Sequence, residues 1–197
     1  YGYALENGFF SATIPWMYAN NTSLLKNDDT ESNLDDPMAV ETVQFLQDLI
    51  WKYKVSPIPD RGFNIFNAFM AGNVAMFGAG RWPLVTFIPE QFKDYDIQLW
   101  PKGKSQTTVF GVDGFPILSS SKNVEAAWKL VKYMTRSTVQ SRLIGSEDAP
   151  LGNIPARRSL ATSKEMAKLP PANYQAYYGS LDGNALSVPA PAEFNKV

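Results

Sequence analysis

FNAFMAGNVAMFGAGRWPLVT, residues 66–86, is the stretch of sequence that decides how this chain folds. We expect a short helix over residues 64–71 that ends at Gly72, because glycine readily adopts the left-handed conformation of a helix C-terminus. A short buried strand over residues 74–77 should follow. A Gly-Arg-Trp turn then carries the large aromatic side chain of Trp82 to the N-terminus of the next helix.

The clearest helix in the sequence lies upstream of this stretch. Asp36 and Pro37 are typical of a helix N-cap and a first helical position, and the Ser-Pro-Ile-Pro run at 56–59 ends the helix after about residue 54. The polar segment 20–36 before it is predicted to be a surface excursion, without the acidic spacing of a calcium loop. Apolar side chains at helical spacing predict one apolar face along the helix: Val40, Val43, Phe45, Leu46, Leu49, Ile50 and Tyr53.

Strands and helices continue to alternate downstream. We expect a strand at 95–99, an extended stretch at 107–118, a helix that starts after Asn123, and a shorter helix from Ser137 to about Gly145. The apolar set of the helix after Asn123 is Ala127, Leu130, Val131 and Met134, with Trp128 beside it. This alternation favours an α/β architecture.

The composition excludes several classes of function. The 197 residues include no cysteine and no histidine, which removes thiolate nucleophiles, disulfides, most zinc sites and the commonest general acid and base. A net charge of −1 offers no basic surface for nucleic acid, and no apolar run approaches the roughly 18 residues of a membrane span. We expect neither a cofactor nor a metal. Aromatic residues make up 13% of the chain; they either fill a core or line a cleft in which sugar C–H faces stack on rings.

Four segments, in order, carry a resemblance to one family. FMAGNVAMFGAGRW (69–82) resembles the central signature of family 1 extracellular solute-binding proteins, the sugar-binding receptors of bacterial ABC importers, a group that includes maltose-binding protein. DIQLWPKG (96–103) resembles the family's strand and P-K-G turn. GFPILSSSKNVEAAW (114–128) resembles its S-S-K-N-P-E-A-A-W helix start, with Val124 in place of the usual proline. PLGNIPAR (150–157) resembles its G-x-x-P-x-R loop.

The resemblance implies a type II periplasmic-binding-protein-like fold. Such receptors have two α/β lobes joined by hinge strands, with the ligand in the cleft between them. Residues 1–108 would form the first part of the C-terminal lobe, 109–136 the hinge and a crossover segment of the N-terminal lobe, and 137–197 a return toward the C-terminal lobe. We therefore expect a fragment that lacks most of the first lobe and is poorly stable alone. A separate chain or self-association would then complete it, and both alternatives stay open.

The resemblance also implies a set of ligand-binding residues. Trp82 would stack on a sugar ring at the cleft floor, and Trp16 and Phe63 would lie on the rim of the same cleft. Arg81 would donate hydrogen bonds to ligand hydroxyls. The structural alternatives are a core tryptophan that anchors a helix, ordinary aromatic packing, and a solvated arginine at a turn.

Three further positions complete this set of expected site residues. Asp113 and Gly114 stand at the crossing into the first lobe, where a polar side chain and bare backbone would meet the ligand; a turn aspartate is the structural alternative. Arg157 belongs to the loop near the cleft mouth, where a salt bridge to a carboxylate is the alternative.

The implied function is that of a non-enzymatic receptor outside the cytoplasm, in the periplasm or lipid-anchored at the cell surface. It would bind a mono- or oligosaccharide and dock on the membrane permease of an ABC transporter. One alternative is a receptor for a polyol, a glycerophosphodiester or a peptide. Another is a glycoside-acting enzyme with the pair Asp94 and Asp96, about 7 Å apart on a strand.

Overall fold

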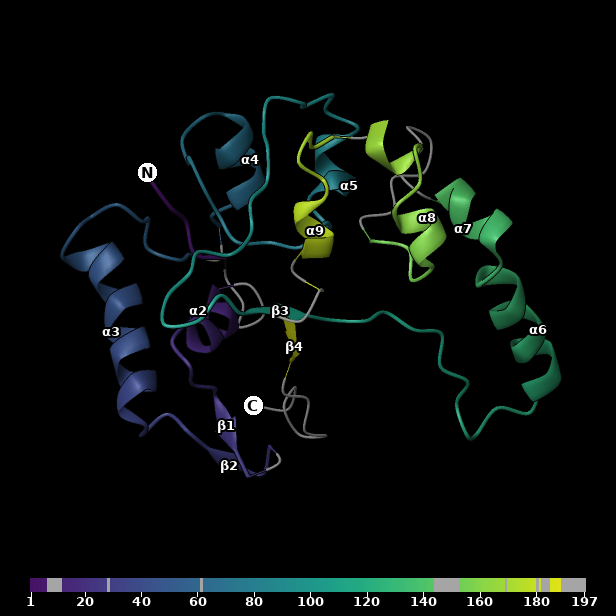
Figure 1. Cartoon of the computed structure of the whole chain (residues 1–197), viewed down its shortest axis with the longest axis horizontal. Helices are drawn as coiled ribbons and strands as arrows, with labels where there is room; N and C mark the ends of the chain where they lie inside the picture. The colour runs from purple at the N-terminus through teal and green to yellow at the C-terminus, as the bar shows by residue number, and fades with distance from the viewer. Residues whose placement is uncertain are drawn as a thin grey trace. The chain divides into compact units, whose positions relative to one another are not determined.

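The computed structural model describes most of the chain as two compact units. The described residues are 1–6, 12–27, 29–60, 62–143, 153–168, 170–179, 181 and 185–188. Unit 1 comprises residues 1–79, 98–111 and 175–197, and unit 2 comprises residues 80–97 and 112–174. Each unit mixes segments that are distant in sequence, and each is described by itself below (Figure 1).

Unit 1 combines helices with two small sheets. Its helices are α2 (Ile14–Ala19), α3 (Pro37–Trp51), α4 (Ile65–Met70) and α9 (Ala176–Gly179). Strands β1 (Leu25–Lys26) and β2 (Glu31–Ser32) form an antiparallel hairpin within the predicted surface excursion. Strands β3 (Thr108–Phe110) and β4 (Ala185–Ser187) pair in parallel. The extended stretch predicted at 107–118 is therefore a strand only over its first part.

Unit 2 is formed by short helices and irregular segments. Its elements are α5 (Leu84–Phe87), α6 (Val124–Met134), α7 (Ser137–Leu143), α8 (Arg158–Ala161) and the 3-10 helix η1 (Met166–Lys168). The predicted end of α7 at Gly145 lies outside the described residues. No helix in the described part of the chain is long and apolar enough to cross a membrane.

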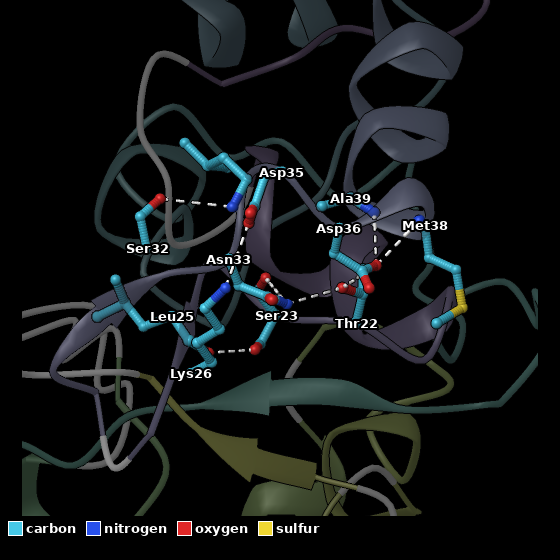
Figure 2. Close-up of polar contacts among 11 residues, drawn as sticks. Thr22, Ser23, Leu25, Lys26, Ser32, Asn33, Asp35, Asp36, Met38 and Ala39 are labelled. Carbon is cyan, nitrogen blue, oxygen red and sulfur yellow. Dashed lines mark hydrogen bonds and ion pairs between the residues drawn. The ribbon is translucent and has the colours of Figure 1, made fainter.

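The start of α3 confirms the predicted N-cap. One carboxylate oxygen of Asp36 accepts hydrogen bonds from the amides of Met38 and Ala39, at 2.9 and 3.2 Å, and from the hydroxyl of Thr22 at 3.1 Å (Figure 2). Asn33 in turn donates to the Thr22 hydroxyl at 3.3 Å. These bonds satisfy amides that have no partner within the helix, and they tie the preceding loop to its N-terminus.

The apolar face predicted for α3 is only partly correct. The helix buries Ala39, Thr42 and Leu46, which recur at helical spacing on one side. Val40 and Val43 are 55% and 48% exposed. The small side chain of Ala39 packs with α2 in the core of unit 1, and the Thr42 hydroxyl donates to the Met38 carbonyl at 2.8 Å. Because α3 contacts its unit along one narrow side, larger apolar residues elsewhere on the helix remain exposed. Tyr53, beyond the end of the helix, is exposed as well.

The segment 66–86 and the residues just before it fold largely as predicted. The Asn64 side chain accepts from the Asn67 amide at 3.0 Å and caps α4, and Gly72 follows the helix with φ of 74°. Residues 74–77 do not form a named strand. They run alongside residues 1–4, and a parallel bridge joins Ala4 to Phe77.

The core of unit 1 joins α2 to the β3–β4 sheet. Ile14, Met17 and Tyr18 of α2 are buried together with Leu24 and Ala39. The Tyr18 hydroxyl donates to the carbonyl of Ser187 in β4 at 2.8 Å. Gly103, the glycine of the P-K-G motif, is required here, because a Cβ atom would lie 2.6 Å from the carbonyl oxygen of Ala19.

The strand predicted at 95–99 does not form. Asn173 instead binds this segment: its amide donates to a carboxylate oxygen of Asp96 at 2.8 Å, and its side chain donates to the Ile97 carbonyl at 2.9 Å. Among the described residues no strand pairs with the segment. A strand needs a partner at a given register, and that partner is not encoded locally.

Helix α6 confirms the predicted helix and its start after Asn123. None of its residues is buried, and Trp128 and Leu130 are 48% and 61% exposed. Its predicted apolar set is thus present in the sequence but packs against little within the described chain.

Candidate functional site

The Gly-Arg-Trp turn at the start of unit 2 holds the strongest candidate residue, Trp82. A Cβ atom at Gly80 would fall on the indole ring, nearest to Cζ3 and 2.7 Å from Cε3. The Trp82 ring therefore lies directly over the backbone of Gly80, an approach that only glycine allows. The amide of Val85 donates to the Trp82 carbonyl at 3.1 Å, so the turn leads straight into α5.

An aromatic cluster fixes α5 behind this turn. Leu84 and Phe87 of α5 are buried. The Phe87 ring packs edge-on against Phe92 and Tyr95, with ring centroids 5.3 and 5.1 Å apart, and these two rings stack on each other at 5.7 Å. Because these ring pairs pack closely, they fix the position of α5, the helix that follows Trp82.

Arg81 is buried, with 4% of the residue exposed, so it is not the solvated arginine of the alternative interpretation. Its Nη1 donates to the main-chain carbonyl of Asn153 at 2.9 Å. A buried guanidinium needs hydrogen-bond acceptors to offset the cost of losing water. The contact joins the turn to a loop 72 residues further along the chain.

Asp113 is connected to the same loop. The side-chain amide of Asn153 donates to a carboxylate oxygen of Asp113 in a short hydrogen bond. Gly114 follows Asp113, is exposed, and has open space where a side chain would start. Asn153 thus links Arg81 and Asp113, and these residues and Trp82 all belong to unit 2.

Arg157 performs a structural role at the end of α6. Its Nε and Nη2 both donate to the carbonyl of Thr135, at 3.2 and 3.0 Å. Thr135 is the C-cap residue of α6, and a cation at a helix C-terminus interacts favourably with the exposed carbonyl groups there. Among the described residues the acceptor of Arg157 is therefore a carbonyl and not the carboxylate of the alternative interpretation. A role of Arg157 in ligand binding stays a prediction.

Trp16 lies in unit 1, within a group of aromatic rings. Its indole packs against Tyr3, Phe45 and Trp100, with centroid distances of 5.7, 5.3 and 5.1 Å. The indole Nε1 donates to the Tyr3 hydroxyl at 3.4 Å. Burial raises the pKa of Tyr3 to about 12, although the hydrogen bond from Trp16 acts in the opposite direction. Trp16 is half-buried, so its ring packs against this group while part of it stays exposed to solvent.

Phe63 also lies in unit 1 and lines a small pocket. The pocket has a volume of about 260 Å³ and is bounded by Leu5, Glu6, Pro59, Asp60, Phe63, Asn64, Ile65 and Phe66. Phe63 and Phe66 pack against the buried cluster of Ala4, Ile65 and Val74. Phe63, one of the two predicted rim residues, therefore borders a cavity.

A larger pocket in unit 1, of about 440 Å³, lies beside the N-terminus of α3. Its lining is mostly hydroxyl and amide groups: Tyr18, Asn21, Thr22, Ser23, Asn33, Asp36, Met38, Thr107 and Leu186. Several of these groups bind one another (Figure 2): Asn33 donates to Thr22 and Ser23, and Thr22 donates to Asp36. The polar groups of this pocket are therefore largely engaged in holding the loop and α3 together.

The structure thus brings together part of the predicted set. Unit 2 contains Arg81, Trp82, Asp113 and Gly114, and there Asn153 connects Arg81 with Asp113. Trp16 and Phe63 belong to unit 1, where they pack in different clusters. Asn153 was not among the predicted residues, although it contacts two of them. The signal for it was the G-x-x-P-x-R loop, whose residues 150–152 lie outside the described residues.

The carboxylate pair that suggested an enzyme does not lie on the strand predicted for it. The segment of Asp94 and Asp96 is not a strand, and one oxygen of Asp96 accepts from the amides of Ile97 and Asn173, at 2.9 and 2.8 Å. No cluster of three or more acidic side chains that could hold a metal occurs among the described residues.

Solved structures of similar fold are solute receptors. The ABC substrate-binding protein Lmo0181 from Listeria monocytogenes, in complex with cycloalternan, matches 100% of this chain and 50% of its own at 23% identity, with a TM-score of 0.77. An ABC transporter solute-binding protein from Thermotoga lettingae bound with alpha-D-tagatose matches 100% and 51% at 24% identity, with a TM-score of 0.77. A cyclo/maltodextrin-binding protein complexed with maltotetraose matches 99% and 50% at 22% identity, with a TM-score of 0.73. The chain spans about half the length of these structures. No curated protein sequence matches it.

These likenesses show a type II periplasmic-binding-protein-like fold of mixed helix and sheet, the fold of binding proteins that work with ABC transporters. The model of the bacterial extracellular solute-binding protein family matches residues 1–141. The chain belongs to this family, whose members are binding proteins with an extracytoplasmic location.

Proposed function

We propose that this protein binds a mono- or oligosaccharide in a cleft between two lobes and delivers it to the permease of an ABC transporter. The observation that carries the proposal is the Gly80-Arg81-Trp82 turn, in which the indole lies over a glycine and the neighbouring arginine is buried. The proposal keeps the division predicted from the sequence. The first part of the C-terminal lobe would be residues 1–108, the hinge and a segment of the N-terminal lobe would be 109–136, and the return toward the C-terminal lobe would be 137–197. The protein would work in the periplasm or at the cell surface.

The chemistry of the turn suits a sugar. One face of a pyranose carries C–H groups that pack on an aromatic ring, and its hydroxyls need hydrogen-bond partners placed at fixed positions. Trp82 supplies the ring, and Asp113 beside Gly114 supplies an exposed carboxylate next to open backbone. Asn153 holds the Asp113 carboxylate, which reduces the entropy that ordering this group on binding would cost.

A thermal-shift screen of the full-length protein against sugars tests the proposal. A ligand that binds only the folded state, at a concentration of 100 Kd, should raise the melting temperature by about 5 to 10 °C. Suitable probes are maltose, maltotetraose and tagatose, with glycerol, a glycerophosphodiester and a dipeptide as competing classes. If the polyol, the phosphodiester or the dipeptide shifts the melting temperature and no sugar does, the carbohydrate proposal is wrong.

A matched pair of tryptophan variants then locates the site. Trp82→Ala should abolish the shift by the sugar, whereas Trp51→Ala should retain it, because Trp51 stands 61% exposed at the end of α3. Equal sugar affinity of the two variants would show that Trp82 packs in the protein and does not contact the ligand. Release of reducing ends from an oligosaccharide would instead support a glycoside-acting enzyme.

A further inference from the structure

The loop of residues 153–157 is anchored at both of its ends to other segments of unit 2. At its start, the main-chain carbonyl of Asn153 accepts a hydrogen bond from Arg81 at 2.9 Å. At its end, the guanidinium of Arg157 donates twice to the carbonyl of Thr135, at 3.2 and 3.0 Å. The proline within the loop fixes one backbone dihedral angle and restricts the residue before it. The loop therefore holds Asn153 at a defined position.

The anchor at the start of the loop is buried. Only 4% of Arg81 is exposed, and a hydrogen bond from a charged donor is stronger where little water competes for it. The bond fixes the main chain of Asn153 against the turn that carries Trp82. Because it uses the main-chain carbonyl, this bond is retained when the side chain of Asn153 is replaced.

The side chain of Asn153 orients the carboxylate of Asp113. Its Nδ2 donates to Oδ2 of Asp113. Asp113 and Gly114 are exposed and lie in a segment without helix or strand, so regular backbone structure does not fix this carboxylate. A hydrogen bond to one carboxylate oxygen fixes the plane of the group and therefore the direction in which the other oxygen accepts.

We propose that Asn153 is a positioning residue for sugar binding, which acts on the ligand through Asp113. Its amide holds the Asp113 carboxylate as an oriented acceptor for sugar hydroxyls, while Arg81 holds Asn153 itself. An acceptor that is oriented before binding loses little rotational freedom when the ligand arrives, so it contributes more to affinity than a freely rotating one. The inference rests on the proposed function and adds to it a residue that sets the geometry of the acceptor.

A double-mutant cycle in the full-length protein tests whether Asn153 acts through Asp113. Titration calorimetry uses whichever of maltose, maltotetraose and tagatose gives the largest thermal shift with the wild type. Asn153→Ala should weaken this sugar by about tenfold. In the Asp113→Ala background the same change should weaken it by less than about twofold, because the carboxylate that Asn153 orients is already absent. Asn153 is exposed, so its variants should fold, and thermal melts without sugar check this.

Asn153→Asp adds a pH-dependent measurement that a purely structural role would not affect. Asp113 and Arg81 are charged residues bonded to Asn153, and an arginine stays charged over the range used. At about pH 7.5 the new carboxylate cannot donate to Asp113 and repels it, so sugar affinity should fall below that of Asn153→Ala. At about pH 4.5 the two carboxyl groups can share a proton, which restores a donor. The affinity relative to wild type at the same pH should then recover.

Asn173→Asp is the matched control in the same unit. The Asn173 side chain also donates a hydrogen bond, to the Ile97 carbonyl at 2.9 Å, and its amide binds Asp96. This variant should keep the sugar affinity of the wild type at both pH values.

Three results would overturn the inference and leave the proposed function intact: wild-type sugar affinity in Asn153→Ala, additive losses in the double variant, or no recovery of Asn153→Asp at low pH. If no sugar binds the wild type at all, the proposed function fails and the inference fails with it.

Discussion

Substitution of Gly80 by alanine is the most direct test of the turn that positions Trp82. The backbone of Gly80 does not need a left-handed conformation, as Gly72 does. In open space the change would therefore stabilise the protein by about 0.4 to 1 kcal/mol, because alanine reduces the entropy of the unfolded chain. In the structure the new Cβ would overlap the indole ring, nearest to Cζ3 and 2.7 Å from Cε3. An indole is rigid, so the whole ring must move.

The expected effect of Gly80→Ala on the free energy of unfolding is therefore opposite in sign to the stabilisation expected in open space. Forcing an extra carbon into a packed site costs about 1 to 3 kcal/mol, so Gly80→Ala should lower the free energy of unfolding despite the entropic gain. Gly114→Ala is the matched control, since no atom of the described structure lies within 4 Å of its added Cβ; its effect should be within about 0.5 kcal/mol of zero or stabilising. Urea unfolding measures both variants, and sugar titration should show weaker binding for Gly80→Ala.

A stabilising effect of Gly80→Ala, or equal effects of the two variants, would refute this reasoning. It would mean that the Trp82 ring does not lie over the turn, and the pre-formed stacking surface would be lost from the proposed function.

Three further predictions, the first with a control substitution, concern other parts of the chain. Asp36→Ala should lower the free energy of unfolding by about 0.5 to 2 kcal/mol, because it removes the N-cap of α3, while Asp35→Ala at an exposed ion pair should change it by less than about 1 kcal/mol in urea unfolding. Arg81→Met should cost about 1.5 to 3 kcal/mol, since it removes a charged hydrogen bond to Asn153; unchanged urea midpoints would contradict this. Tyr3 has a pKa of about 12 in the folded protein against 10.0 ordinarily. Its contribution to stability is therefore complete below pH 10 and is lost as pH rises toward 12. Between about pH 10 and 12 the free energy of unfolding, followed by thermal melts, should fall by up to about 2 kcal/mol more in the wild type than in Tyr3→Phe. Parallel pH profiles of the two proteins would contradict this prediction.

The sequence alone determined the local features of this fold. Asp36, Asn64 and Gly72 mark helix ends that the structure confirms, because a cap involves residues only two or three positions apart. The helix that starts after Asn123 was predicted from the apolar spacing of the residues that follow, which is also a local feature. The four family segments also identified the receptor family and its fold from the order of short motifs.

Only the tertiary structure decided which of these residues meet. Arg81 was predicted either to donate to ligand hydroxyls or to be a solvated arginine at a turn, yet it is buried and donates to the carbonyl of Asn153, 72 positions away. The segment 95–99 had the pattern of a strand, but Asn173 binds its Asp96 carboxylate and its Ile97 carbonyl, and no strand of the described residues pairs with it. The physical reason is common to both: buried polar groups and strands need partners, and the chain supplies those partners from distant segments whose position no local pattern encodes.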